Sequence, residues 1–125
     1  MTTRQGRTTK ERKIVAPMLA LNIDEEIRRL KVEPEWVSGV EDGITLVRYP
    51  HMRIVLIALR KGKSMHEHKV KGPISLFVVS GKISLITGKS ETQLKPRGLF
   101  TLRKAIPHDV RALVDSVIIL TIMAL

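Results

Sequence analysis

The stretch ISLFVVSGKISLIT, residues 74–87, decides the fold. It contains two short runs of apolar residues, 74–80 and 82–87, that meet at Gly81 and Lys82. Short runs rich in Val, Ile and Phe that are bounded by Gly or polar residues are typical of β-strands. The stretch therefore predicts two strands joined by a tight turn.

The same pattern extends in both directions along the chain. Further short runs, separated by segments that contain Pro, Gly or charged residues, lie at residues 44–49, 52–59, 64–70, 91–95, 99–103, 108–113 and 117–125. About nine closely spaced strands with no long helix between them favour an antiparallel sandwich or barrel and disfavour a parallel α/β layout. The fold class that we expect is all-β.

The N-terminal part of the chain differs from the rest. Residues 1–13 are polar and basic, which predicts a disordered start to a tail that we extend over residues 1–21. Residues 22–31 predict a short amphipathic helix, capped by Asn22 or Asp24 and ended by Pro34. We assign residues 22–125 to a single domain that includes this helix.

Several strands are apolar on both faces. Residues 76–79 and 117–123 contain almost no polar side chain, whereas a strand with one solvated face alternates apolar and polar residues. Either a second subunit or the helix at 22–31 alone covers the outer face. We favour a homodimer packed through a sheet, because a helix of that length spans only about 15 Å.

Composition excludes several classes of function. The chain has no cysteine, so disulfides and thiolate metal sites are excluded. Its net charge is +10, but its few aromatic residues and the lack of a nucleic-acid-binding motif argue against nucleic acid as a partner. No run is long enough to span a bilayer, so we expect no membrane contact and a cytoplasmic location.

Three histidines could form a metal site. In a strand, residues two apart share a face, so His66 and His68 would present both imidazoles to one side and Glu67 would face the other. His108 opens a strand about forty residues later, and three imidazoles with an open position suit a divalent metal. The alternative is that these are polar surface histidines. His51 follows Pro50 in a predicted turn and is expected to be exposed.

These residues resemble the two motifs of the cupin superfamily. In the first motif Gly62, His66, His68 and Gly81 match a glycine, the histidine pair and a hairpin-turn glycine; in the second, the matches are Gly98, Pro107 and His108. The resemblance implies a small single-domain cupin, with a jelly-roll (double-stranded β-helix) barrel. It also implies a divalent metal (Fe, Zn, Ni or Mn) held by His66, His68 and His108.

Two departures from the motifs bear on function. The motif glutamate falls near Ile74, where no acid stands, and residues 103–105 replace a proline–alanine–glycine stretch. Three neutral imidazoles leave the charge of a divalent metal uncompensated, which favours an anionic ligand. Arg103 and Lys104 are the candidate rim residues for such a ligand.

Two functions stay open from the sequence. In the first, a metal-binding cupin acts on or binds a small molecule. In the second, a metal-free cupin module senses or binds a ligand without catalysis. No convincing general base is evident, so the sequence leaves open whether the protein is an enzyme.

Overall fold

The computed structural model describes residues 14–39, 41–67, 72–103 and 106–123. Within them lie two helices, α2 (Ile23–Lys31) and α3 (Pro34–Val37). Nine strands follow: β1 (Glu41–Tyr49), β2 (Met52–Leu59), β3 (Ser64–Glu67), β4 (Ile74–Ser80), β5 (Ile83–Thr87), β6 (Ser90–Leu94), β7 (Leu99–Leu102), β8 (His108–Ala112) and β9 (Ser116–Met123). The predicted all-β class is confirmed, and the predicted bounds of β2 and β4 are those observed.

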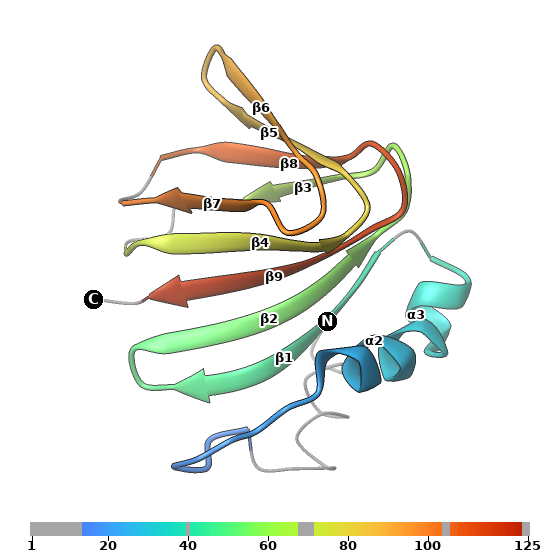
Figure 1. Ribbon diagram of the computed structural model, residues 1–125, viewed down its shortest axis with the longest axis vertical. Helices are drawn as coiled ribbons and strands as arrows, with labels where there is room; N and C mark the ends of the chain where they lie inside the picture. The colour runs from blue at the N-terminus through green and yellow to red at the C-terminus, as the bar shows by residue number, and fades with distance from the viewer. Residues whose placement is uncertain (1–13, 40, 68–71, 104–105, 124–125) are drawn as a thin grey trace.

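The strands form two antiparallel sheets that face each other (Figure 1). Sheet A has the order β1-β2-β9-β4-β7, and sheet B has the order β3-β8-β5-β6. Strands that are consecutive in sequence repeatedly switch from one sheet to the other, which is the jelly-roll arrangement. The face of each sheet that is directed toward the other sheet is called its inner face below.

The turn at Gly81 connects the two sheets. The sequence motif predicts a hairpin here, but β4 belongs to sheet A and β5 to sheet B, so the hairpin is wrong. Lys82 continues the crossing, because its N–H donates to Ser116 Oγ at 3.0 Å and its carbonyl accepts from Leu113 N at 2.9 Å. The chain is thereby directed across to sheet B instead of back along sheet A.

The main core fills the space between the sheets. Its buried members alternate along the strands, as inner-face residues must. They are Ile57, Leu59, Ile74, Leu76, Val78, Ile83, Leu85, Val110, Ala112, Ile118 and Leu120. Full burial of each such Val, Leu or Ile side chain contributes about 1.5–3 kcal/mol, so this core is the principal source of stability.

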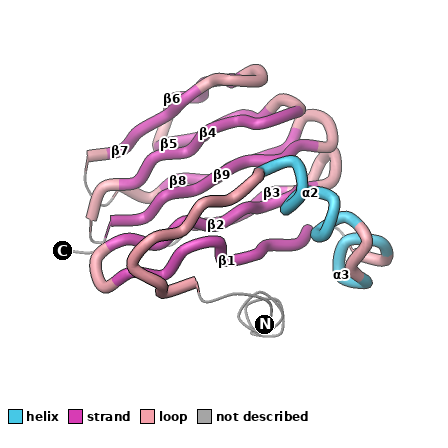
Figure 2. Tube along the Cα trace, turned by 60° about the horizontal axis from the view of Figure 1, so that its bottom comes forward, coloured by secondary structure: helices cyan, strands magenta, loops and turns pink. Residues whose placement is uncertain are grey.

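A second core covers the outer face of sheet A. Helices α2 and α3 lie on this side in both views (Figures 1 and 2). Leu30 and Trp36 of the helices pack with Leu46, Leu56 and other buried residues of β1, β2 and β9. This packing explains why these strands are apolar on both faces, and over this part of the sheet the helices do the covering.

Residues 14–21 also contact the domain. Ile14 is buried, its carbonyl accepts from Arg48 N at 2.9 Å, and Leu19 and Leu21 pack against the second core. The packed chain thus includes at least part of the segment assigned to the tail. The disorder predicted for residues 1–13 lies outside the described residues and stays a prediction.

Local sequence explains the helices. The Asn22 side chain accepts from Glu25 N at 3.0 Å, as a helix N-cap does, and Ile23, Ile27 and Leu30 face the second core as predicted. Pro34 does not simply end the segment. It begins α3, because proline is favoured at the first position of a helix, where its missing N–H costs nothing.

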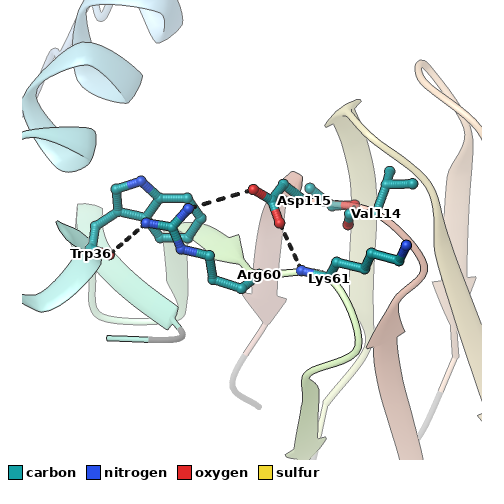
Figure 3. A network of polar contacts seen from close by, with 6 residues as sticks. Trp36, Arg60, Lys61, Val114 and Asp115 are labelled. Atoms are coloured by element: carbon teal, nitrogen blue, oxygen red, sulfur yellow. Dashed lines mark hydrogen bonds and ion pairs between the residues drawn. The ribbon is translucent and has the colours of Figure 1, made fainter. Parts of the chain in front are cut away.

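Arg60 ties α3 to the barrel (Figure 3). Its guanidinium carbon lies 3.9 Å from the centroid of the buried Trp36 ring, and its Nη2 donates to the Trp36 carbonyl at 3.0 Å. Asp115 accepts from Lys61 N at 2.7 Å and lies 3.5 Å from Arg60 Nη1. The ion pair is too exposed to contribute much, so the ring stack and the carbonyl hydrogen bond hold α3 in place.

Candidate functional site at the open end of the barrel

The predicted site segments meet at one end of the barrel. The β1–β2 turn, the end of β3, the start of β8 and the end of β9 all lie there, on the left of Figure 1 where the C-terminus is marked. This is called the open end below. The opposite end, which contains Gly81, Arg60 and Asp115, is called the far end.

His108 is the best-defined residue of the site. It is 4% exposed and shares the inner face of β8 with the core residues Val110 and Ala112. Its Nδ1 lies 2.9 Å from the carbonyl oxygen of Ile106, and since a carbonyl can only accept, Nδ1 carries a proton and donates. Nε2 is buried and has no hydrogen-bond partner among the described residues.

This arrangement fits a metal ligand. In the neutral ring, a proton on Nδ1 leaves the lone pair on Nε2, and a backbone carbonyl on the far nitrogen is the usual orienting partner of a metal-bound histidine. A buried polar atom without a partner costs about 1–3 kcal/mol, so such atoms call for an explanation. A bound cation at Nε2 would provide one.

The neighbouring strand meets His108 in an unexpected register. Glu67 lies directly opposite His108, and His66 lies opposite Asp109. Residues directly opposite each other in an antiparallel pair share a face, so position 67 is the one on the His108 side. Sequence parity predicts the histidine positions on that side instead. His68 lies outside the described residues, so the three-histidine set stays a prediction.

The residue at the position of the motif glutamate is Ile74, and its surroundings in the structure are also apolar. Ile74 is 4% exposed and belongs to the core between the sheets. Within residues 14–39, 41–67, 72–103 and 106–123, no group of three His, Asp or Glu residues is arranged to hold a metal ion.

Arg103, one of the predicted rim residues, lines a groove of about 470 Å³. The groove includes Ser75, Thr101 and Thr121, whose register places them in one row across β7, β4 and β9. That row lies on the outer face of sheet A, on the side away from His108. Lys104 lies outside the described residues, so a role for this pair at the rim stays a prediction.

Two arginines at the open end, Arg48 and Arg53, were not predicted from the sequence as site residues. Arg53 is in the same alternation as the core residues Ile57 and Leu59, so it lies on the inner face of β2. Arg48 lies directly opposite Arg53 on β1. The sequence alone could have indicated the face of Arg53, because it is a charged residue that alternates with apolar inner-face residues of its strand. The face of Arg48 could not be predicted, because a bulge between Thr45 and Val47 changes which residues of β1 face inward.

Two further features lie at or near this end. His51 is exposed in the β1–β2 turn, as predicted. A cavity of about 230 Å³ adjoins His108 and is lined by Ile86, Gly88, Pro107, His108 and Asp109.

None of the helices within the described ranges has the length and apolar character needed to cross a bilayer.

Comparison with known proteins identifies the fold. Neither protein-family models nor curated proteins match the chain. Among solved structures, a cupin superfamily protein from Desulfitobacterium hafniense matches with a TM-score of 0.65 and 13% identity, over 67% of this chain and 77% of that one. A conserved protein of unknown function from Streptococcus pyogenes matches with a TM-score of 0.67 and 16% identity, over 90% of this chain and 93% of that one. The chain has the cupin fold, as its histidine and glycine motifs predict.

An enzyme is also among the similar structures. Salicylate 1,2-dioxygenase from Pseudaminobacter salicylatoxidans matches with a TM-score of 0.75 and 16% identity. The match covers 89% of this chain but only 36% of the dioxygenase. At this identity the likeness establishes the fold alone.

Proposed function

We propose that this protein is a cupin that binds a divalent metal at the open end of its barrel and binds or acts on a small molecule there. The proposal is carried by Nε2 of His108, which is buried and has no hydrogen-bond partner in the part of the chain that the structure describes. His108 would be one ligand, and the segment from His66 to His68 would supply the others. The sequence motif favours His66 and His68, whereas the register favours position 67.

The donor set suits a first-row metal. Imidazole nitrogens, with or without a carboxylate, can bind iron, zinc, nickel or manganese. A divalent ion with an open position supplies Lewis acidity to an oxygen of the bound molecule. The chain itself would contribute the inner-face walls that exclude water, together with the carbonyl of Ile106, which orients the imidazole of His108.

A metal-free binding module is the alternative. Ile74 favours it, because an apolar side chain occupies the position where the cupin motif has a carboxylate ligand. In that case the open end would bind a small molecule without catalysis. A cytoplasmic location and the lack of a nucleic-acid or membrane partner remain expectations from the sequence.

Metal analysis decides between these functions. Protein purified without chelator is expected to contain close to one equivalent of a divalent metal, measured by elemental analysis. His66→Asn, Glu67→Gln and His68→Asn, made singly, then identify the remaining ligands, because only true ligands lower the metal content. Well under one equivalent in the wild type, with no uptake after incubation with zinc or ferrous iron, would instead favour the metal-free module.

We also propose that the protein is a homodimer, through the part of sheet A that the helices leave uncovered. Leu99 of the edge strand β7 is 62% exposed and lies opposite Phe77 on the same outer face. The groove of about 470 Å³ lies on this face too. A large apolar side chain on an edge strand is a common feature of strand faces that pair with another chain.

Leu99→Lys is expected to convert the dimer to a monomer, because a lysine at an apolar interface would be buried without a partner. Size-exclusion chromatography with light scattering measures the mass. Val32→Lys is the matched control, because Val32 is 76% exposed and lies just after α2, which contacts β1 and β2 at the edge of sheet A opposite to β7. A monomeric wild type, or a dimer that survives Leu99→Lys, would refute this interface.

A further inference from the structure

We propose that Arg48 and Arg53 form an anion-binding subsite at the open end of the barrel, which takes the carboxylate or phosphate group of a small ligand. This deepens the proposed function, because it rests on small-molecule binding at the open end. It does not depend on the metal. The groups that carry it are two guanidinium groups, not the histidines.

The geometry places both arginines toward the barrel interior. Arg53 lies opposite Ile122 of β9, which packs against the core between the sheets, and opposite Arg48 of β1. His108 lies on the inner face of sheet B at the same end. The two arginines and His108 therefore border the open end from opposite sheets.

A cavity adjoins the pair. Its volume is about 230 Å³, and its lining consists of Arg48, Tyr49, Pro50, Met52, Arg53 and Ile122. This volume is smaller than the ~300–1,000 Å³ of typical small-molecule pockets. It suits one charged group with an adjoining apolar part, such as a carboxylate on an aromatic or short aliphatic body, with the remainder of the ligand extending toward the barrel.

The positive charges of Arg48 and Arg53 favour the binding of an anion. Arg53 lies directly opposite Arg48 at partly buried positions, and like charges in this arrangement destabilise a sheet unless a counter-charge lies nearby. Arg48 has interactions within the chain and is anchored by its backbone bond to Ile14. Within the described residues, the guanidinium of Arg53 makes no hydrogen bond or ion pair, so its donors are available.

The chemistry of guanidinium specifies the ligand group. A planar guanidinium donates two parallel hydrogen bonds to a carboxylate or phosphate, and a second cation beside it reinforces the binding. A lysine at position 53 would offer only a point charge. An anion held by Arg53 would place the ligand body at the same end of the barrel as His108.

Calorimetry with simple probes tests the subsite in the full-length protein. Benzoate is the carboxylate probe, benzamide is its neutral counterpart, and phenyl phosphate is the phosphate probe. We expect the wild type to bind benzoate or phenyl phosphate, or both, and to bind benzamide at least about tenfold more weakly, because the charge-assisted hydrogen bonds are lost. The tighter of the two anions identifies the ligand class.

Variants locate the binding. Arg53→Gln is expected to weaken binding of the anion about 10- to 100-fold, and Arg53→Lys to weaken it less. Arg111→Gln is the matched control: it removes the same charge from an exposed residue of β8 whose position alternates with the core residues Val110 and Ala112. An equal loss in Arg111→Gln would show that net charge, not a site, attracts the anion, and would overturn the proposal.

Three further outcomes would overturn it. One is benzamide binding as tightly as the anions. Another is the absence of measurable anion binding to the wild type. The third is an Arg53→Gln variant with a lower melting temperature and unchanged anion affinity, which would mean that Arg53 stabilises the barrel and does not bind the ligand.

Metal content separates this subsite from the proposed metal site. Arg53→Gln is expected to keep the metal content of the wild type while losing anion binding. If the wild type holds no metal but binds benzoate through Arg53, the metal proposal fails and the subsite stands. If it holds metal and binds no anion, the subsite fails and the metal proposal stands.

Discussion

Replacing His108 with leucine is expected to abolish the stabilisation of the protein by metal, without loss of stability in the absence of metal. Among the described residues the buried Nε2 has no hydrogen-bond partner, which costs about 1–3 kcal/mol in the absence of a ligand, and leucine has no such atom. The Ile106 carbonyl that His108 contacts belongs to an exposed residue, so water can replace the imidazole donor. In the presence of chelator, His108→Leu should therefore unfold at the wild-type temperature or above it.

Added metal should reverse this order. A ligand at a hundred times its dissociation constant stabilises the native state by about 2.7 kcal/mol. For a domain of this size that corresponds to a rise of the melting temperature on the order of 10 °C. The wild type should show this rise in a thermal-unfolding scan with metal, and His108→Leu should show none.

His51 provides the control for this experiment. It lies at the same end of the barrel but is exposed in the β1–β2 turn, so His51→Asn should respond to metal as the wild type does. An unchanged metal response in His108→Leu would exclude His108 as a ligand. A metal-free His108→Leu protein that is several kcal/mol less stable would show that Nε2 has a partner within the chain.

Replacing Gly81 with alanine is expected to destabilise the protein by about 2–5 kcal/mol, which lowers the melting temperature on the order of 10–20 °C. Gly81 has φ +88°, a conformation that costs an L-residue about 1–2 kcal/mol. A Cβ there would also lie 2.5 Å from the Asp115 carbonyl oxygen and 2.6 Å from Ser116 Cα. These are backbone atoms of the β8–β9 turn and cannot rotate away.

A substitution at Gly62 distinguishes the conformational cost of a positive φ from the steric cost of the added Cβ. Its φ of +83° is nearly the same, but a Cβ there would meet nothing within 4 Å. Gly62→Ala should therefore cost only the conformational part, about 1–2 kcal/mol. Chemical denaturation of both variants measures the difference. Equal losses would mean that the β8–β9 turn shifts to admit the methyl group.

Much of the fold could be predicted because strand formation is encoded locally. Residues 52–59 and 74–80 are apolar runs bounded by turn residues, and both form strands with those bounds. The pairing of strands was not local. A strand pattern does not state which sheet a strand joins, so the crossing at Gly81 became visible only through its contacts with Ser116.

The site was predictable to a smaller extent. His108 was a candidate because it follows Pro107 at the start of a strand, and the structure shows that it is buried. Parity along 64–70 could state which residues alternate, but not which set faces the barrel, since a shift of one residue reverses the assignment. The register with β8 places position 67 opposite His108, and Arg48 was hidden by the bulge before it.

The contacts of the far end have a consequence for motion. There the Lys82 N–H donates to Ser116, and the Asp115 carboxylate accepts from Lys61 and pairs with Arg60, so turns of both sheets are held together. Any separation of the two sheets should therefore be hinged at the far end, which makes the open end the part of the barrel that can widen to admit a ligand.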